Sequence, residues 1–294
     1  MTEAAKSWFL FARSFDYVGT TLFVGGMAFI ALLWPDGADT ARARRLIAFG
    51  WLCGFVGTVA SLAFNAAWVA GRPPSAAFGW SVLVPLFDAP FGRVWFARTM
   101  LWLLALVVLA DLARRGARAA RSWSWRVGAG AVALGVLRTN GMTGHALDLP
   151  GWGQAVVFVH LLVVCVWVGG LMVLLLAVLP ARDRDVLIAV LPRYSRLAVV
   201  SVAVLTVAGA VLAWRLVGSL NSLLHTGYGQ LLLIKLALFA VLLLLGLASK
   251  TWVDRRLSVA PTTRALALSV TAEAVLAVVV LGVAAFLVTT GPGR

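Results

Sequence analysis

The chain has 294 residues, of which 62% are hydrophobic and only 12% are charged, and its mean hydropathy is +0.97. Soluble domains carry about 25% charged residues, so this composition excludes an ordinary water-soluble protein and indicates one that lies in membrane lipid. The formal net charge of +14 does not indicate nucleic-acid binding, because no basic stripe alternates with exposed aromatic residues. Both cysteines, Cys53 and Cys165, fall within apolar runs, which disfavours a structural disulfide.

Eight apolar runs are long enough to cross the hydrocarbon core of a bilayer as helices, which takes about 20 residues. The fourth run is the shortest, and it contains Arg138. Residues 1–294 are therefore predicted to form a single all-α, eight-helix membrane domain, with 1–126 plus 127–143 as its first four helices and 144–294 as its second half. In chain order the predicted spans are Trp8–Trp34, Leu46–Ala70, Val94–Leu112, Val127–Met142, Trp152–Leu179, Leu197–Val217, Leu231–Ser249 and Ala265–Thr289.

Basic residues are concentrated in alternate loops between these runs. Most of the 25 Lys and Arg residues follow the first, third, fifth and seventh spans. By the positive-inside rule those loops are cytoplasmic, which predicts that both termini are periplasmic. The first run is too long for the apolar region of a cleavable signal peptide and contains Asp16, so no cleavable signal peptide is expected.

Two pairs of segments suggest an internal duplication. The run Val24–Met27 is similar to Val168–Leu171, and the same offset of 144 sets Asp16 against His160. These matches predict a 4+4 parallel repeat whose axis lies along the membrane normal, with the first and fifth helices facing each other and a site between the halves. Chance matching in apolar sequence is the alternative. The second pair shares an aromatic-Gly-x5-cation pattern: Phe91-Gly92 with Arg98, and Tyr228-Gly229 with Lys235.

The predicted topology places all three histidines on the periplasmic side. His145 and His225 fall in outer loops, whereas His160 lies about 12 Å along the fifth span. An imidazole at that depth is expected to face the bundle interior and to have a partner. Met142 and His145 could share a face and supply a thioether and an imidazole, which suit copper, and Cu(I) above Cu(II). As an alternative to metal binding, each histidine could form a hydrogen bond between helices or be solvated by water.

Four ionisable residues within the spans are candidates for copper binding or charge pairing. Asp16 lies at a depth like that of His160 and is its expected acidic partner. Glu273 is near mid-membrane, where it could be an inner cation station, a proton acceptor or the counter-ion of a buried arginine. Arg98 and Lys235 would repel copper, so either they pair with these acids or they bind something anionic.

Other patterns limit the chemistry. Asn140 is near an outer helix end, where it could hydrogen-bond a ligand or cap the helix. The sequence has no G-x-x-x-x-G-K-[ST] loop for nucleotide phosphates and no H-E-x-x-H or G-x-S-x-G motif. These absences predict a protein that is not an enzyme and binds no nucleotide, so that any transport is driven by a gradient or a partner.

The second half resembles the copper resistance protein D (CopD/PcoD) family. The resemblance is strongest over about residues 140–250. It implies an eight-helix, multi-pass protein of the bacterial inner membrane that moves copper inward from the periplasm and contributes to copper resistance. The motifs, in chain order, are Gly144-His145-Ala146, His160, Trp167–Leu171, Arg193-Tyr194-Ser195, Thr226–Gly229 and Lys235.

The resemblance also implies a partner and site residues. Family members work alongside, or are fused to, a CopC-like periplasmic copper carrier; because the first span begins near Trp8, a separate carrier is expected. Copper-related roles pass by resemblance to His145 and His160, and also to the segment that contains Tyr228 and Lys235.

Two functions of different classes remain open at this stage. The first is a copper permease with Met142, His145 and His225 at an outer mouth and a deeper site below, from which copper passes toward the cytoplasm. The second is a b-type haem or quinone redox protein in which two histidines hold the iron and basic residues hold the propionates. A non-transporting membrane partner of a periplasmic copper carrier is a third alternative. The residues below the mouth are Asp16, His160 and Glu273, and the candidate propionate-binding residues are Arg98, Arg138 and Lys235.

Overall fold

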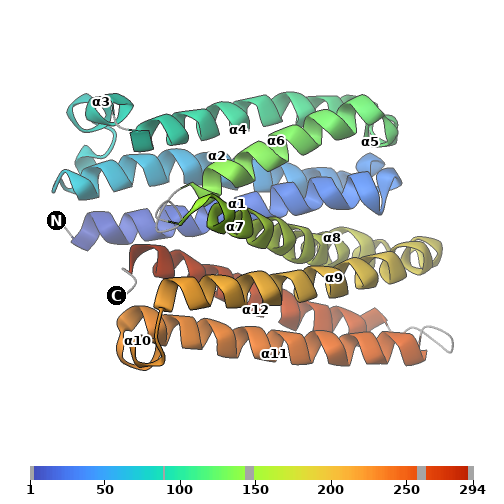
Figure 1. Ribbon diagram of the computed structural model, residues 1–294. Coiled ribbons are helices and arrows are strands. Elements are labelled where there is room, and N and C mark those ends of the chain that lie inside the picture. The colour runs from blue at the N-terminus through green and yellow to red at the C-terminus, as the bar shows by residue number, and fades with distance from the viewer. Residues whose placement is uncertain (1–2, 89, 143–148, 257–262, 291–294) are drawn as a thin grey trace.

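The structure is a computed structural model and describes residues 3–88, 90–142, 149–256 and 263–290. Within these ranges all regular secondary structure is helical. The long helices run along one common direction, and the start of α1 and the end of α12 lie at the same end of the bundle (Figure 1). The prediction of an all-α protein is confirmed.

Eight long helical segments and several short ones make up the bundle. Seven of the long segments are α1 (Glu3–Leu32), α2 (Ala41–Val69), α4 (Pro90–Arg115), α6 (Trp123–Gly141), α9 (Arg184–Val217), α11 (Gly227–Arg256) and α12 (Thr263–Thr289). The other is composite: α7 (Gly151–Val164), the π-helical turn η4 (Cys165–Gly169), α8 (Gly170–Val173), the π-helical turn η5 (Leu174–Val178) and the 3-10 turn η6 (Leu179–Ala181). Short helices connect them: η1 (Pro35–Asp39), η2 (Pro74–Ala76), α3 (Trp80–Asp88), α5 (Ala117–Arg121) and α10 (Leu220–His225).

Seven helical segments in the described part of the chain are long and apolar enough to cross a membrane. They correspond to every predicted span except the fourth. That span forms α6, which has 19 residues and carries Arg126 and Arg138. The structure thus agrees with a multi-pass membrane protein, and α6 is a helix that length and composition alone do not assign to the membrane.

The helix that contains the sixth predicted span begins earlier than the predicted span. The sequence placed the start of that span at Leu197, but α9 begins at Arg184 because the side chain of Asp183 caps it. The Asp183 carboxylate accepts hydrogen bonds from the backbone N–H groups of Asp185 and Val186, at 3.0 and 3.2 Å. Such a cap satisfies N–H groups that have no partner within the helix. Arginines predicted to lie in the preceding loop therefore lie on α9.

Close backbone contacts make α1 the central helix. A Cβ on Gly19 would lie 2.6 Å from Gly54 Cα on α2, and a Cβ on Gly25 would lie 2.6 Å from Gly169 Cα on η4. Only glycine permits this approach, which is a common way for membrane helices to associate. Consequently α1 is the most buried of the seven spans, whereas α9 and α11 are the most exposed.

Candidate functional site

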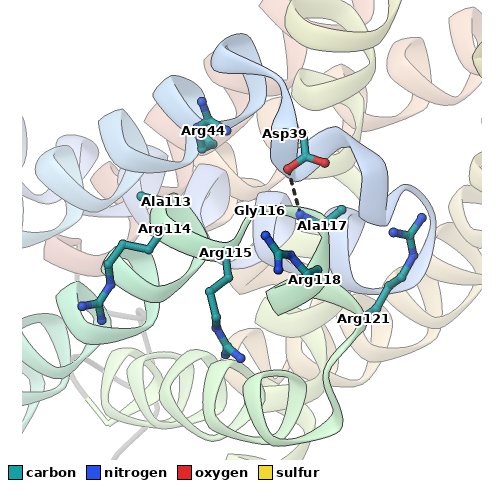
Figure 2. A pocket seen from close by; sticks show the side chains of 9 residues that line it. All are labelled: Asp39, Arg44, Ala113, Arg114, Arg115, Gly116, Ala117, Arg118 and Arg121. Carbon is teal, nitrogen blue, oxygen red and sulfur yellow. Dashed lines mark hydrogen bonds between the residues drawn. The ribbon is translucent and has the colours of Figure 1, made fainter.

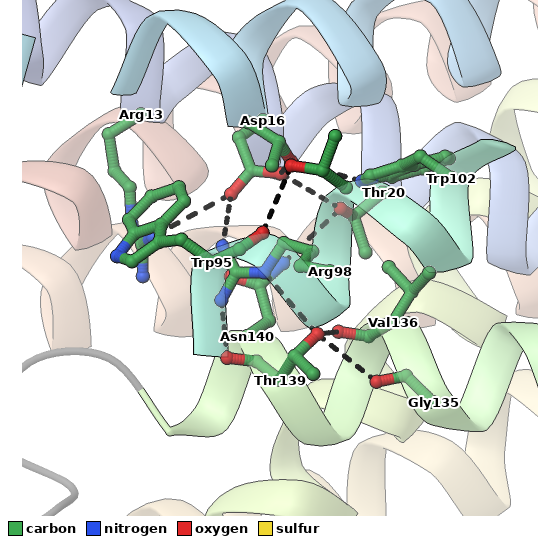
Figure 3. A network of polar contacts seen from close by, with 12 residues as sticks. Arg13, Asp16, Thr20, Trp95, Arg98, Trp102, Gly135, Val136, Thr139 and Asn140 are labelled. Atoms are coloured by element: carbon green, nitrogen blue, oxygen red, sulfur yellow. Dashed lines mark hydrogen bonds and ion pairs between the residues drawn. The ribbon is translucent and has the colours of Figure 1, made fainter. Parts of the chain in front are cut away.

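A cluster of polar side chains is buried between α1, α2, α4 and α6 (Figure 3). At its centre Asp16 on α1 and Arg98 on α4 are both 0% exposed, and Arg98 Nη1 lies 3.2 Å from Asp16 Oδ2. The sequence left two roles open for Arg98, pairing with an acid or binding an anion. The structure shows the acid pair.

The second oxygen of Asp16 is also engaged. The Thr58 hydroxyl donates to Asp16 Oδ1 at 3.0 Å and accepts a hydrogen bond from Trp102 Nε1 at 3.0 Å. Thr20, one turn along α1, donates to the same oxygen at 3.5 Å. Both carboxylate oxygens are therefore solvated by protein groups, as a buried charge requires.

Arg98 is held from its other side by α6. Its Nε donates to Thr139 Oγ1 at 3.3 Å, and its Nη2 donates to the Thr139 carbonyl. The Trp95 ring centroid lies 4.6 Å from Arg98 Cζ, which adds a cation–π contact. The guanidinium is thus fixed by two helices besides its own.

A second arginine extends the cluster. Arg13 is 1% exposed, its Nη1 lies 3.7 Å from Asp16 Oδ2, and its Cζ lies 5.4 Å from the Trp95 ring. Asn140 on α6 donates to Thr20 Oγ1 at 3.3 Å, which joins α6 to α1. Two guanidinium groups beside the carboxylate of Asp16 oppose the approach of a copper cation. The hydrogen bonds and ion pairs of this cluster join four helices to one another.

His160 lies apart from this cluster. It is half-buried on α7 and faces α9, where a Cβ on Gly209 would lie 3.7 Å from His160 Cε1. Its Nδ1 is buried and has no hydrogen-bond partner within the described residues. The predicted pair between His160 and Asp16 is not formed, because Asp16 is engaged by Arg98, Thr58 and Thr20.

The predicted outer mouth is described only in part. His145 lies outside the described residues, and Met142 is half-buried at the end of α6. His225 is exposed on α10, and its Nδ1 lies 3.1 Å from the Asn221 carbonyl. Within the described ranges no three side chains of His, Cys, Asp or Glu gather as they would around a metal ion. A copper site at this mouth stays a prediction.

The remaining candidates have different surroundings. Glu273 on α12 is 6% exposed, and its Oε2 lies 3.8 Å from the position of a Cβ on Gly246 of α11. Lys235 is half-buried. Tyr228 belongs to a small apolar cluster at the start of α11, which gives it a packing role. The other members of that cluster are Val217, Leu232 and Leu287.

The sequence did not single out several residues that build the interior. Arg13 precedes Asp16 by three residues, and that helical spacing is a signal that could have found it. Tyr194 on α9 was part of a family motif, but its contact was not predicted: its hydroxyl donates to the Trp167 carbonyl in η4 at 2.8 Å. The π-helical geometry there disrupts regular i to i−4 bonding and is frequent at functional sites.

Comparison with known families covers both halves of the chain. Residues 1–156 match the family model described as copper resistance protein D-like, N-terminal domain, and residues 188–287 match copper resistance protein D. The chain belongs to the copper resistance protein D family. The match extends over the first four helices, where the sequence motifs were weakest, and the predicted family resemblance is confirmed.

A curated relative of this copper resistance protein D family member is the copper transport protein CutJ of Bacillus subtilis (strain 168). The two are 29% identical over 254 residues, which cover 80% of this chain and 44% of CutJ. The chain therefore spans less than half the length of that relative. No solved structure matches the chain.

Proposed function

We propose that this protein carries copper from the periplasm across the bacterial inner membrane, as part of copper resistance and homeostasis. The observation that carries the proposal is the match of both halves to copper resistance protein D families. The name of the relative CutJ, a copper transport protein, favours transport over catalysis. We expect a separate CopC-like periplasmic protein to deliver the copper.

The topology that we propose has eight crossings. The 19 residues of α6 extend about 28 Å at about 1.5 Å per residue, close to the roughly 30 Å thickness of a bilayer core. An even number of crossings agrees with α1 starting and α12 ending at the same end of the bundle (Figure 1). The arginine-rich connections at the other end favour a cytoplasmic location for that end and a periplasmic one for the termini.

We further infer that the two halves are a parallel duplication. If a two-fold axis relates the two halves, residues that lie on this axis contact the equivalent residues of the other half. A Cβ on Gly25 would lie 2.6 Å from Gly169 Cα, and one on Gly169 would lie 2.7 Å from Gly25 Cα. One turn earlier, Thr21 Oγ1 lies 3.9 Å from Cys165 Sγ. Both pairs have the offset of 144 found in the sequence.

A second correspondence supports the duplication. A Cβ on Gly92 of α4 would lie 2.5 Å from the carbonyl carbon of Leu86, six residues earlier. In the second half, a Cβ on Gly229 of α11 would lie 2.6 Å from the carbonyl carbon of Leu223, again six residues earlier. Each glycine thus lets a span begin against the short helix that precedes it.

The inferred duplication supports a copper site in the second half of the chain. Asp16 and Arg98 of the first half correspond to His160 and Lys235 of the second. Asp16 and Arg98 form an ion pair, whereas neither His160 nor Lys235 forms an ion pair with an acid among the described residues. An imidazole whose ring nitrogen has no partner within the described residues is available to a metal, and imidazole is a good copper ligand.

His160→Ala tests this proposal. We expect copper accumulation by cells to fall at least about 10-fold, because the imidazole ligand is lost. Val159→Ala, next to it on the exposed face of α7, is the matched control and should leave accumulation unchanged. Membrane amounts of both variants are measured by immunoblot. Unchanged accumulation with normally inserted His160→Ala would overturn the proposed station.

An absorption spectrum separates copper transport from the haem alternative. We expect no Soret band from the purified protein, together with copper in its metal analysis after exposure to copper salts. The structure gives the haem little support, since Arg98, a candidate for its propionates, is engaged by Asp16 and Thr139. A Soret band in stoichiometric amount would contradict the copper proposal. Copper flux in reconstituted vesicles distinguishes a transporter from a non-transporting membrane partner.

A further inference from the structure

A second, strongly basic site lies at the end of the bundle away from the chain termini (Figure 2). There a pocket of about 350 Å³ is bounded by η1 and the start of α2 on one side and by the corner between α4 and α5 on the other. Small-molecule sites have volumes of about 300–1,000 Å³. The charged lining residues are Asp39, Arg44, Arg114, Arg115, Arg118 and Arg121.

The acid in this lining serves to shape the pocket. Asp39 Oδ1 accepts a hydrogen bond from the Ala117 backbone N–H at 3.0 Å, which ties η1 to the start of α5. Gly116 has a positive φ of 55°, and a Cβ there would collide with the Asp39 carboxylate. The corner therefore depends on a glycine and on a fixed carboxylate, and its remaining lining charges are all positive.

Three of the arginines are oriented by neighbours in the protein. Arg44 Nη1 donates to the Ala38 carbonyl at 2.9 Å, Arg115 pairs with Asp111, and Arg121 pairs with Asp36. A guanidinium has five N–H donors, so each of these contacts leaves donors over for a ligand.

Two other arginines of the pocket have no such restraint. Arg114 and Arg118 make no hydrogen bond or ion pair with the described residues. Both are exposed, at the end of α4 and on α5. Their charge is therefore available to an anion in the pocket, and their removal takes no contact away from the fold.

We propose that this pocket binds a phosphate group, carried either by an anionic phospholipid headgroup or by free phosphate. The planar guanidinium of arginine presents two parallel N–H donors to two oxygens of a phosphate group. These hydrogen bonds are strengthened by the opposite charges. The pocket also lies where the spans α2 and α4 reach one end of the bundle, which is the depth of lipid headgroups. Its residues take no part in the proposed copper path, so this inference stands independently of that proposal.

The double variant Arg114→Gln/Arg118→Gln tests the site. The control is Arg42→Gln/Arg45→Gln, which removes the same charge from exposed positions of α2 that do not line the pocket. The purified full chain in detergent is titrated with phosphatidylglycerol or phosphatidylcholine, and bound lipid is read by native mass spectrometry. We expect phosphatidylglycerol to bind about 30-fold more weakly to the pocket variant, as for two arginines near an anionic surface, and almost normally to the control.

Competition with inorganic phosphate identifies the source of the phosphate group. If millimolar phosphate displaces phosphatidylglycerol, the pocket takes free phosphate; if it does not, the pocket is a headgroup site. Equal losses in the pocket and control variants would reduce the effect to general surface charge and overturn the proposal, as would no loss in either. Should the double variant fail to fold, Arg118→Lys is tested instead. It keeps the positive charge but loses the paired N–H donors of the guanidinium, so it should weaken phosphatidylglycerol binding by less than about 30-fold.

Discussion

Replacing Asp16 with Asn should destabilise the protein by about 3–5 kcal/mol, the range for breaking a buried ion pair from one side. The amide fills the same space, so the loss comes from charge and not from a cavity. Arg98 would keep its contacts with Thr139 but lose the carboxylate 3.2 Å away. Arg13 would lose the same neighbour at 3.7 Å, leaving two buried guanidinium groups without it.

The measurement is reversible unfolding in detergent by tryptophan fluorescence. Asp36→Asn is the matched control, because Asp36 pairs with Arg121 at the exposed surface and such pairs contribute less than about 1 kcal/mol. Adding Arg98→Met to Asp16→Asn should recover part of the lost stability, since it removes one of the two buried guanidinium groups next to the altered side chain. If Asp16→Asn unfolded no more easily than the control, the polar cluster would not be a tie among the helices.

The helical architecture could be predicted because each span is a local property of the chain. A long apolar run is stable in lipid as a helix, and seven such runs form helices that are long and apolar enough to cross a membrane. The helix ends were harder to predict where a polar residue caps the helix beyond the apolar run, as Asp183 does at the start of α9. The fourth helix was found despite Arg138, but its membrane crossing has to be argued from the arrangement of the bundle.

The partner of Asp16 could not be predicted in the same way. Sequence position gives the depth of a residue along its helix, and Asp16 and His160 have similar depths. It does not give the direction in which a side chain points around the bundle. That direction depends on how α1 packs against α2, and Gly57 sets this contact: a Cβ there would lie 2.8 Å from Asp16 Cα. The carboxylate is thereby turned toward Thr58 and Arg98.

Gly169→Ala should destabilise the protein by about 1–3 kcal/mol, the usual range for overpacking a well-packed contact. The added methyl group would lie 2.7 Å from Gly25 Cα, and it would also overlap the Thr21 carbonyl. Both obstacles are backbone atoms, so no side chain can rotate away and α1 must separate from η4. Because this contact joins the two halves, the unfolding transition should also become less cooperative.

A glycine with open space around it provides the control. Gly282 in α12 has nothing within 4 Å of a Cβ, so Gly282→Ala should stabilise the helix by about 0.5–1 kcal/mol. The same chemical change is thus expected to have opposite signs at the two positions. Gly25→Ala should resemble Gly169→Ala, and the double variant should be less destabilised than the sum, since one separation of the helices accommodates both methyl groups. Additive losses would mean that the two glycines act at separate contacts, which would contradict a shared axis between the halves.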